Sequence, residues 1–268
     1  MLRKLFALLK RDFLVASSYK LDFMMYWVHA LALLLPFFFV AKMLGQTESS
    51  FLLPYGGDYF SFVLIGLGLR RYLSHALHSL AGAIGEEQGL GTFEALLVTP
   101  TSFKSIFFLL SLLSFLYATL SLLFYIFLGS VLFHVRFPNA NFVGAFLILL
   151  FTTFTFTAFG LLSASSILVF KKGSTVEPFL EGFSSFLGGV YFPVTVLPFW
   201  LQKFSEFVPM TYILRPIRLC LLKGTSLSAL GNDLFVLILL TAVLFPVGLW
   251  IFGKALQKAK KDGSLIHY

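Results

Sequence analysis

Six long apolar runs dominate the sequence, at about residues 23–41, 59–80, 103–133, 142–170, 177–193 and 232–253. A helix needs roughly 20 consecutive apolar residues to cross a bilayer, and in lipid its backbone polar groups must all be bonded internally. Because 58% of the residues are hydrophobic and only 12% are charged, these runs do not fit the core of a soluble protein. The sequence therefore predicts an all-α polytopic membrane protein with six transmembrane helices.

The composition excludes several other classes of protein. The chain of 268 residues contains 35 phenylalanines, which is incompatible with disorder. Cys220 is the only cysteine, so no disulfide forms within the chain. The net charge of +8 does not indicate a nucleic-acid partner, because the basic residues lie between apolar runs rather than on one polar face.

The basic residues predict how the chain is oriented. With six spans, 12 Lys and Arg residues fall on one side of the membrane and six on the other, while Arg70 and Arg71 lie inside the second run. The positive-inside rule makes the richer side cytoplasmic. We therefore expect a multi-pass protein of the cell inner (plasma) membrane, with spans within 23–253, a basic tail at 254–268 and both termini in the cytoplasm.

Residues 1–22 are predicted to form an amphipathic interfacial helix. Leu5 and Leu9 recur at helical spacing, and Arg3 and Lys10 fall mostly on the other side. In such a helix the cations meet anionic lipid while the apolar face enters the acyl boundary, so membrane lipids are expected partners. A cytosolic helix packed on the body of the protein is the alternative.

Proline residues interrupt the apolar segment at residues 191–222. The four prolines are Pro193, Pro198, Pro209 and Pro216. Because interior proline breaks a helix, and because broken helices at membrane depth need a protein or water-lined cover, we expect short re-entrant helices on the outer side after the fifth span. Trp200 and Tyr212 suit that interfacial level. A loop pinned by prolines is the alternative.

The predicted cytoplasmic loop at residues 82–102 carries a regular pattern. Glu86 and Glu87 form an acidic patch in an otherwise basic chain. After Gly91, Thr92 is placed to cap a short helix that Pro100 closes.

The side chains of this short helix are arranged to fit a partner. Glu94 lies in its first turn, where the helix dipole favours an acid. Its apolar ridge consists of Phe93, Leu96 and Leu97. Such a helix suits a groove on another protein, and the acidic patch suits a basic surface. A helix folded back on the bundle is the alternative.

The same loop resembles a known family. Glu86, Glu87 and the run Gly91–Pro100 are similar to the glutamate-then-GTLExLLxTP signature of the permease subunits of type 2 ATP-binding-cassette (ABC) exporters. The chain differs from that signature at Phe93, where the family usually has leucine, and at Gly85 and Leu90 in the acidic stretch.

A second region supports the resemblance, which covers nearly the whole chain. Residues Tyr191–Leu201, then Pro209–Tyr212 and Arg218, resemble the family's FFPVxxLPxWL…PxTY stretch after the fifth span. The resemblance implies a half-transporter that dimerises, as a homodimer in the simplest case, and pairs with a separate ATPase to move a lipid, glycan, drug or peptide outward. Residues 86–100 would be the ATPase-coupling helix. ATP and Mg would bind the partner, since this chain contains no GxxxxGK[ST] phosphate loop.

Four charged residues are candidates for a substrate path or gate. Arg70 and Arg71 lie inside the second run, where a central charge costs about 2.5–3.5 kcal/mol on insertion scales. Glu177 and Glu181 are four residues apart near the start of the fifth run and share a helix face. The arginines either face a substrate or pair with such acids or backbone carbonyls, or they extend to the interface.

Two functions from other classes remain open from the sequence. A membrane-embedded lipid-modifying enzyme would use the His, Arg and Glu groups of the second and fifth runs, but no nucleophile and base pair is evident. The spacing of His75 and His78 suits a metal only if a third ligand is near, and none is evident. A gradient-driven carrier predicts internal repeats, whereas the proline-broken segment occurs once. We therefore expect no catalytic residue, metal or cofactor in this chain.

Overall fold

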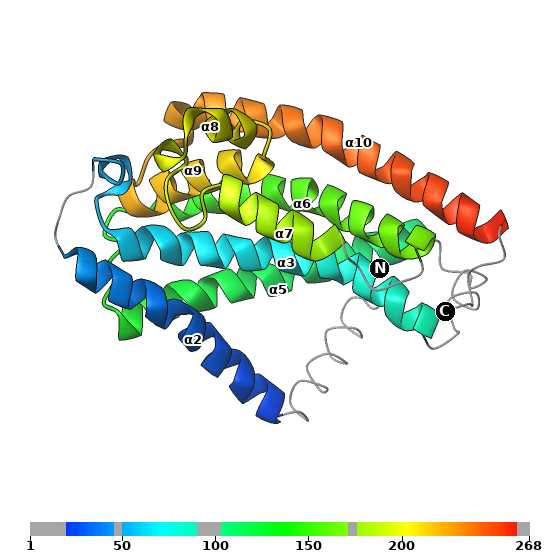
Figure 1. Cartoon of the computed structure of the whole chain (residues 1–268), viewed down its shortest axis with the longest axis horizontal. Helices are drawn as coiled ribbons and strands as arrows, with labels where there is room; N and C mark the ends of the chain where they lie inside the picture. The colour runs from blue at the N-terminus through cyan, green and yellow to red at the C-terminus, as the bar shows by residue number, and fades with distance from the viewer. Residues whose placement is uncertain (1–19, 46–49, 90–102, 171–175, 262–268) are drawn as a thin grey trace.

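The computed structural model describes residues 20–45, 50–89, 103–170 and 176–261, and these form helices and short connections without a strand (Figure 1). The five long helices are α2 (Lys20–Leu44), α3 (Tyr59–Gly89), α5 (Phe103–Leu132), α6 (Phe142–Phe170) and α10 (Gly231–Lys261). The short ones are η1 (Leu53–Tyr55), α7 (Val176–Leu187), η2 (Val194–Val196), α8 (Phe199–Ser205), α9 (Pro209–Lys223) and η3 (Leu227–Leu230). The all-α prediction is confirmed.

Helix α3 forms the centre of the bundle. It packs against α5 on one side and α6 on another, and α7 and α9 also contact it. Its residues from Phe62 to Leu69 are almost completely buried, and the main hydrophobic core extends from them to α9. Helix α10 packs along α6, while α2 diverges from the bundle toward its N-terminal end (Figure 1). The other long helices are thus arranged around α3 and α6.

The bundle has two ends, which we name by the lysines that mark them. At the Lys261 end, α3, α6 and α10 finish and α7 begins; at the Lys42 end, α2 finishes and η1 and α8 lie (Figure 1). Lys254, Lys258 and Lys260 lie on the last turns of α10 at the Lys261 end.

Four of the described helices are long and apolar enough to cross a membrane: Trp27–Leu44, Ser111–Leu132, Phe142–Phe170 and Leu227–Lys261. The central helix α3 does not meet this criterion, although its 31 residues span about 46 Å at 1.5 Å per residue. Its polar residues, Arg70 and Arg71 among them, lower its hydropathy. Because α5 and α6 enclose it, α3 does not need a lipid-soluble surface.

The fifth predicted span differs most from the structure. It was expected at 177–193, but α7 ends at Leu187 and has only 12 residues. Gly188 and Gly189 follow, and the φ of +80° at Gly189 belongs to the left-handed region that favours glycine. A helix of this length covers about 18 Å, which is less than a bilayer core. The chain turns at this point because of its glycines, five residues before the first proline.

Other boundaries extend beyond the predicted ones. The second predicted run ended at residue 80, whereas α3 continues to Gly89, and α10 continues through the first eight residues of the predicted tail to Lys261. The interfacial helix predicted at 1–22 lies outside the described residues, apart from residues 20–22, which begin α2. Residues 262–268 also lie outside them.

Candidate functional site

The residues predicted to contact an ATPase begin in the last turn of α3 and continue beyond it. Glu86 and Glu87 lie in that turn, at the Lys261 end, and their side chains are outside the described part of the structure. The rest of the predicted set is also outside it: Gly91, Thr92, Phe93, Glu94, Leu96, Leu97 and Pro100. The fold therefore places the start of this segment but not its side chains.

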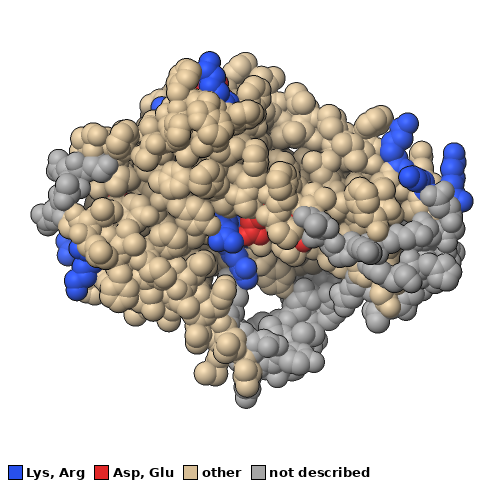
Figure 2. All heavy atoms as spheres, viewed as in Figure 1, with Lys and Arg blue, Asp and Glu red and all other residues tan. Residues whose placement is uncertain are grey.

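Two of the four candidate gate residues, Arg70 and Glu181, form an ion pair between α3 and α7. Arg70 Nε donates to Glu181 Oε1 at 3.0 Å, and Arg70 Nη1 donates to the Tyr191 hydroxyl at 3.0 Å. The Tyr191 ring stacks on Phe37 of α2, with ring centres 5.7 Å apart. Figure 2 shows few charged side chains on this face of the molecule, and near its middle basic (blue) and acidic (red) side chains lie in contact. Arg70 thus ties α3 to α7 and to the segment after it.

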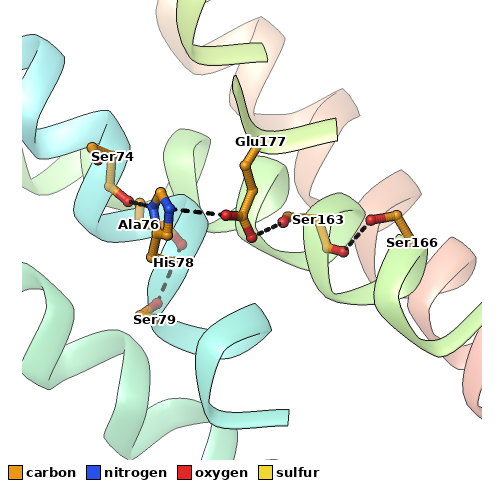
Figure 3. Close-up of polar contacts among 7 residues, drawn as sticks. All are labelled: Ser74, Ala76, His78, Ser79, Ser163, Ser166 and Glu177. Atoms are coloured by element: carbon orange, nitrogen blue, oxygen red, sulfur yellow. Dashed lines mark hydrogen bonds and ion pairs between the residues drawn. The ribbon is translucent and has the colours of Figure 1, made fainter. Parts of the chain in front are cut away.

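The other predicted acid, Glu177, contacts different partners. Glu177 Oε2 lies 2.9 Å from His78 Nε2, and Ser163 of α6 donates to Glu177 Oε1 at 2.5 Å (Figure 3). The Glu177 side chain is 7% exposed and His78 is 58% exposed. Three helices therefore meet at one carboxylate near the Lys261 end.

The hydrogen bonds around His78 determine how many protons the site holds. His78 Nδ1 lies 2.8 Å from the Ser74 carbonyl, which can only accept, so Nδ1 carries a proton. The contact between His78 Nε2 and Glu177 then requires one further proton, held either as imidazolium and carboxylate or as imidazole and carboxylic acid. In both states the hydrogen bond is favourable, so it offsets the free-energy cost of burying the Glu177 carboxyl group.

This group of Ser, Glu and His is not a nucleophilic triad. In a triad the histidine lies between the hydroxyl and the acid and accepts the hydroxyl proton. Here the acid lies between Ser163 and His78, and the serine donates to the carboxylate (Figure 3). The arrangement does not activate the hydroxyl, and its evident role is to hold α7 against α3 and α6.

The two acids of α7 pair with two different bases of α3. Glu181 pairs with Arg70 and Glu177 with His78, eight residues further along α3. The paired-carboxylate chemistry that their i, i+4 spacing allows does not arise, because each acid has its own base. Arg71 is half-buried beside them and has interactions of its own. Among the four candidates, Arg70 and Glu181 are brought together, as one alternative in the sequence analysis proposed.

The Arg70–Glu181 pair is expected to stabilise the contact between α3 and α7 by about 1 kcal/mol, since partly exposed ion pairs contribute little more. Arg70→Gln, Glu181→Gln and the double variant form a thermodynamic cycle, measured by thermal unfolding of the purified chain. A coupling energy near zero would show that the pair does not hold the two helices together.

The proline-containing segment at residues 191–222 contains the two short helices α8 and α9. Pro193 precedes η2, Pro198 precedes α8, and Pro209 is the first residue of α9, a position where its missing N–H costs nothing. Trp200 is exposed on α8 and contacts Phe204 edge-on, and Tyr212 is half-buried on α9. The prolines thus begin helices rather than interrupt them, except for Pro216 inside α9.

Sequence analysis named Arg218 of α9 only as part of the family resemblance, and it did not predict that this side chain is the most enclosed charge of the described chain. Its Nη1 and Nη2 donate to the carbonyls of Gly189 and Val190 at 2.8 and 3.0 Å, and its Nε donates to the Phe62 carbonyl at 3.1 Å. The guanidinium carbon lies 3.4 Å from the centre of the Phe62 ring. Arg218 therefore satisfies the backbone where the chain leaves α7. A signal was present, since Arg218 shares an apolar helix face with Leu214 and Leu221.

Within the described residues, no group of three or more His, Cys, Asp and Glu side chains could hold a metal ion. His75 and His78 point to different partners, because His75 Nε2 contacts Ser121 Oγ of α5 at 3.1 Å.

Comparison with protein families gives one result. Residues 3–222 match the family model described as ABC-2 type transporter, over the membrane domain of that family. Among curated proteins, none matches the chain.

Proposed function

Because the chain belongs to the ABC-2 type transporter family, we propose that it is the permease subunit of an ATP-driven exporter, coupled to a separate ATPase through residues 86–100. The substrate, a lipid, glycan, drug or peptide, moves outward between two copies of the chain. The family match is the observation that carries this proposal, and it fits a transport permease rather than an enzyme.

The arrangement of the helices supports a six-span topology within this proposal. Helices α2, α3, α5, α6, α7 and α10 cross the membrane, with the Lys261 end in the cytoplasm. Helices α8 and α9 re-enter from the outside and complete the short crossing of α7. The lysines of α10 at the Lys261 end agree with the positive-inside rule.

The connection of α3 to α7 supports the mechanism of coupling. Helix α3 is continuous from the Lys42 end to Gly89, where the proposed coupling segment begins. A displacement of that segment by the ATPase would move α3 as a rigid rod, and the contacts of Arg70 and His78 would carry α7 with it. The partner holds the ATP and Mg, and this chain converts the motion into opening and closing of the path.

The test is association with the ATPase. A tagged chain purified from its own membranes should carry an ATP-hydrolysing subunit in equimolar amount. Glu94→Lys together with Leu97→Asp should reduce that amount at least tenfold, because the substitutions reverse a charge and bury an acid in the contact, each of which costs several kcal/mol. Gel densitometry and ATP hydrolysis measure the loss.

A matched control places the same substitutions at the Lys42 end. Glu206→Lys with Leu53→Asp alters one exposed acid and one exposed leucine there, and should leave association unchanged. A purified chain that transports or turns over substrate with no ATPase bound would contradict the proposal, as would normal association in the Glu94 and Leu97 variant.

A further inference from the structure

A cavity of about 560 Å³ opens at the Lys42 end, between the end of α2, the start of α3 and the connection from α5 to α6. Two cations, an imidazole and three aromatic rings line it: Lys42, Arg136, His134, Phe38, Phe60 and Phe133. It is separate from the polar contacts of α7, and the coupling mechanism makes no use of it.

Two formal positive charges, those of Lys42 and Arg136, line the cavity against one carboxylate among the described residues. Lys42, His134 and Arg136 are exposed, and none forms an ion pair. The acid in the described lining is Asp58, which caps α3: its Oδ2 accepts from the Ser61 amide at 2.9 Å and from the Ser61 hydroxyl, and its Oδ1 accepts from the Phe60 amide at 3.3 Å. The two cations outnumber the carboxylate by one, so the cavity presents a small excess of positive charge to an anion.

The floor of the cavity is aromatic. The ring centre of Phe133 lies 4.8 Å from those of both Phe38 and Phe60, and the latter two are 5.6 Å apart. Exposed apolar side chains lie beside the cavity on the last turns of two membrane helices: Phe39 and Met43 of α2, and Val131 and Leu132 of α5. A ligand here would thus meet cations at one side and lipid-facing carbon at the other.

The backbone at His134 supports a ligand-binding role for its side chain. The φ of His134 is +58°, in the left-handed region that glycine adopts freely and other residues adopt uncommonly. This conformation occurs just after the end of α5. There the Val135 amide donates to the Gly129 carbonyl at 3.0 Å, and the Val135 side chain is buried. This conformation places the exposed His134 side chain in the lining of the cavity, where its imidazole N–H can donate to a ligand.

We propose that this cavity binds the phosphate group of an anionic lipid. Lys42, Arg136 and His134 contact the phosphate oxygens, and the acyl chains extend past the aromatic floor along α2 and α5. The site goes beyond the proposed transport function, since it requires only that α2 and α5 span the bilayer; with the topology proposed above, the lipid belongs to the outer leaflet. A cation cluster at headgroup depth with adjoining apolar surface is what such a lipid recognises.

The test measures lipid retention by the full-length chain in detergent, using native mass spectrometry with added phosphatidylglycerol. The wild-type chain should retain this lipid, and His134→Gly combined with Lys42→Gln and Arg136→Gln should lower the retained fraction at least fivefold. The His134→Gly variant alone should lower it about threefold while leaving the fold intact, because glycine suits the backbone at that position. Lys203→Gln, which removes a cation of α8 outside the cavity, is the matched control and should change nothing.

Two further ligands distinguish the source of the phosphate. Phosphatidylcholine, whose headgroup is neutral overall, should be retained less than phosphatidylglycerol, and glycerol 3-phosphate at millimolar concentration should not displace the bound lipid. If the triple variant retained phosphatidylglycerol as well as the wild-type chain does, the proposed site would be wrong. If glycerol 3-phosphate displaced the lipid, the site would bind a soluble phosphate ester rather than a lipid. Because no ATPase is present, failure here leaves the exporter proposal standing, and loss of ATPase association leaves this site standing.

Discussion

Replacing Arg218 with methionine is expected to prevent most of the chain from folding stably. The substitution leaves the carbonyls of Gly189 and Val190 without the donors that Arg218 provides. Each unsatisfied buried carbonyl costs about 1–3 kcal/mol, so the two together cost about 2–6 kcal/mol. That is a large part of the 5–15 kcal/mol that separates a typical folded domain from its unfolded state. The measurement is the monodisperse fraction and the thermal midpoint of the chain after extraction.

Two variants make this expectation specific. Arg218→Lys keeps a charge but not the planar fork that serves three carbonyls, so it should restore little. Arg215→Gln, one turn earlier on α9, removes an arginine whose side chain is 60% exposed and whose contact with Asp233 is 3.4 Å long. It should destabilise the chain less than Arg218→Met does, because it leaves one carboxylate, Asp233, without its cation but no backbone carbonyl without its donor. Similar losses from Arg218→Met and Arg215→Gln would contradict the role given to Arg218.

Gly160→Ala is expected to separate the two helices at the centre of the bundle. A Cβ atom at Gly160 of α6 would lie 2.4 Å from the Ala76 carbonyl oxygen of α3, and that oxygen belongs to backbone that cannot rotate away. Overpacking of this kind costs about 1–3 kcal/mol when side chains adjust, and backbone displacement places this case at the upper limit. Thermal unfolding and proteolysis of the purified chain measure the effect.

A second glycine provides the control for this substitution. A Cβ atom at Gly82 of α3 would meet no atom within 4 Å. Gly82→Ala should therefore leave the thermal midpoint unchanged or raise it, because alanine favours a helix over glycine by about 1 kcal/mol. If both substitutions were equally tolerated, α3 and α6 would not be in the close contact described above.

Much of the helical architecture could be predicted from the sequence, because apolar runs of sufficient length indicate helices in lipid. The fourth run, 142–170, coincides with α6. Helix α3 continues past the end of its run, since its last residues are polar and carry no hydropathy signal. Hydropathy also failed at α7, where the apolar character continues past Leu187 but the backbone turns at Gly188 and Gly189.

Individual contacts were less predictable than helices, because they depend on which faces meet. The sequence placed Arg70 and Glu181 as possible partners, but it did not distinguish Glu181 from Glu177 as the acid that Arg70 contacts. The pairing of Glu177 with His78 and Ser163 requires three helices to be positioned together. The cavity at Lys42 likewise combines residues from distant parts of the chain, whose proximity no local pattern reveals.

The central position of α3 has a consequence for biosynthesis. Arg70 emerges from the ribosome 111 residues before Glu181. At roughly 5–20 residues per second, the arginine waits about 6–22 s for its carboxylate. For most of that interval α6, which later shields α3, is also unfinished. Because a central charge costs about 2.5–3.5 kcal/mol on insertion scales, we expect early release of the nascent helix into lipid to be disfavoured until the helices that shield it follow.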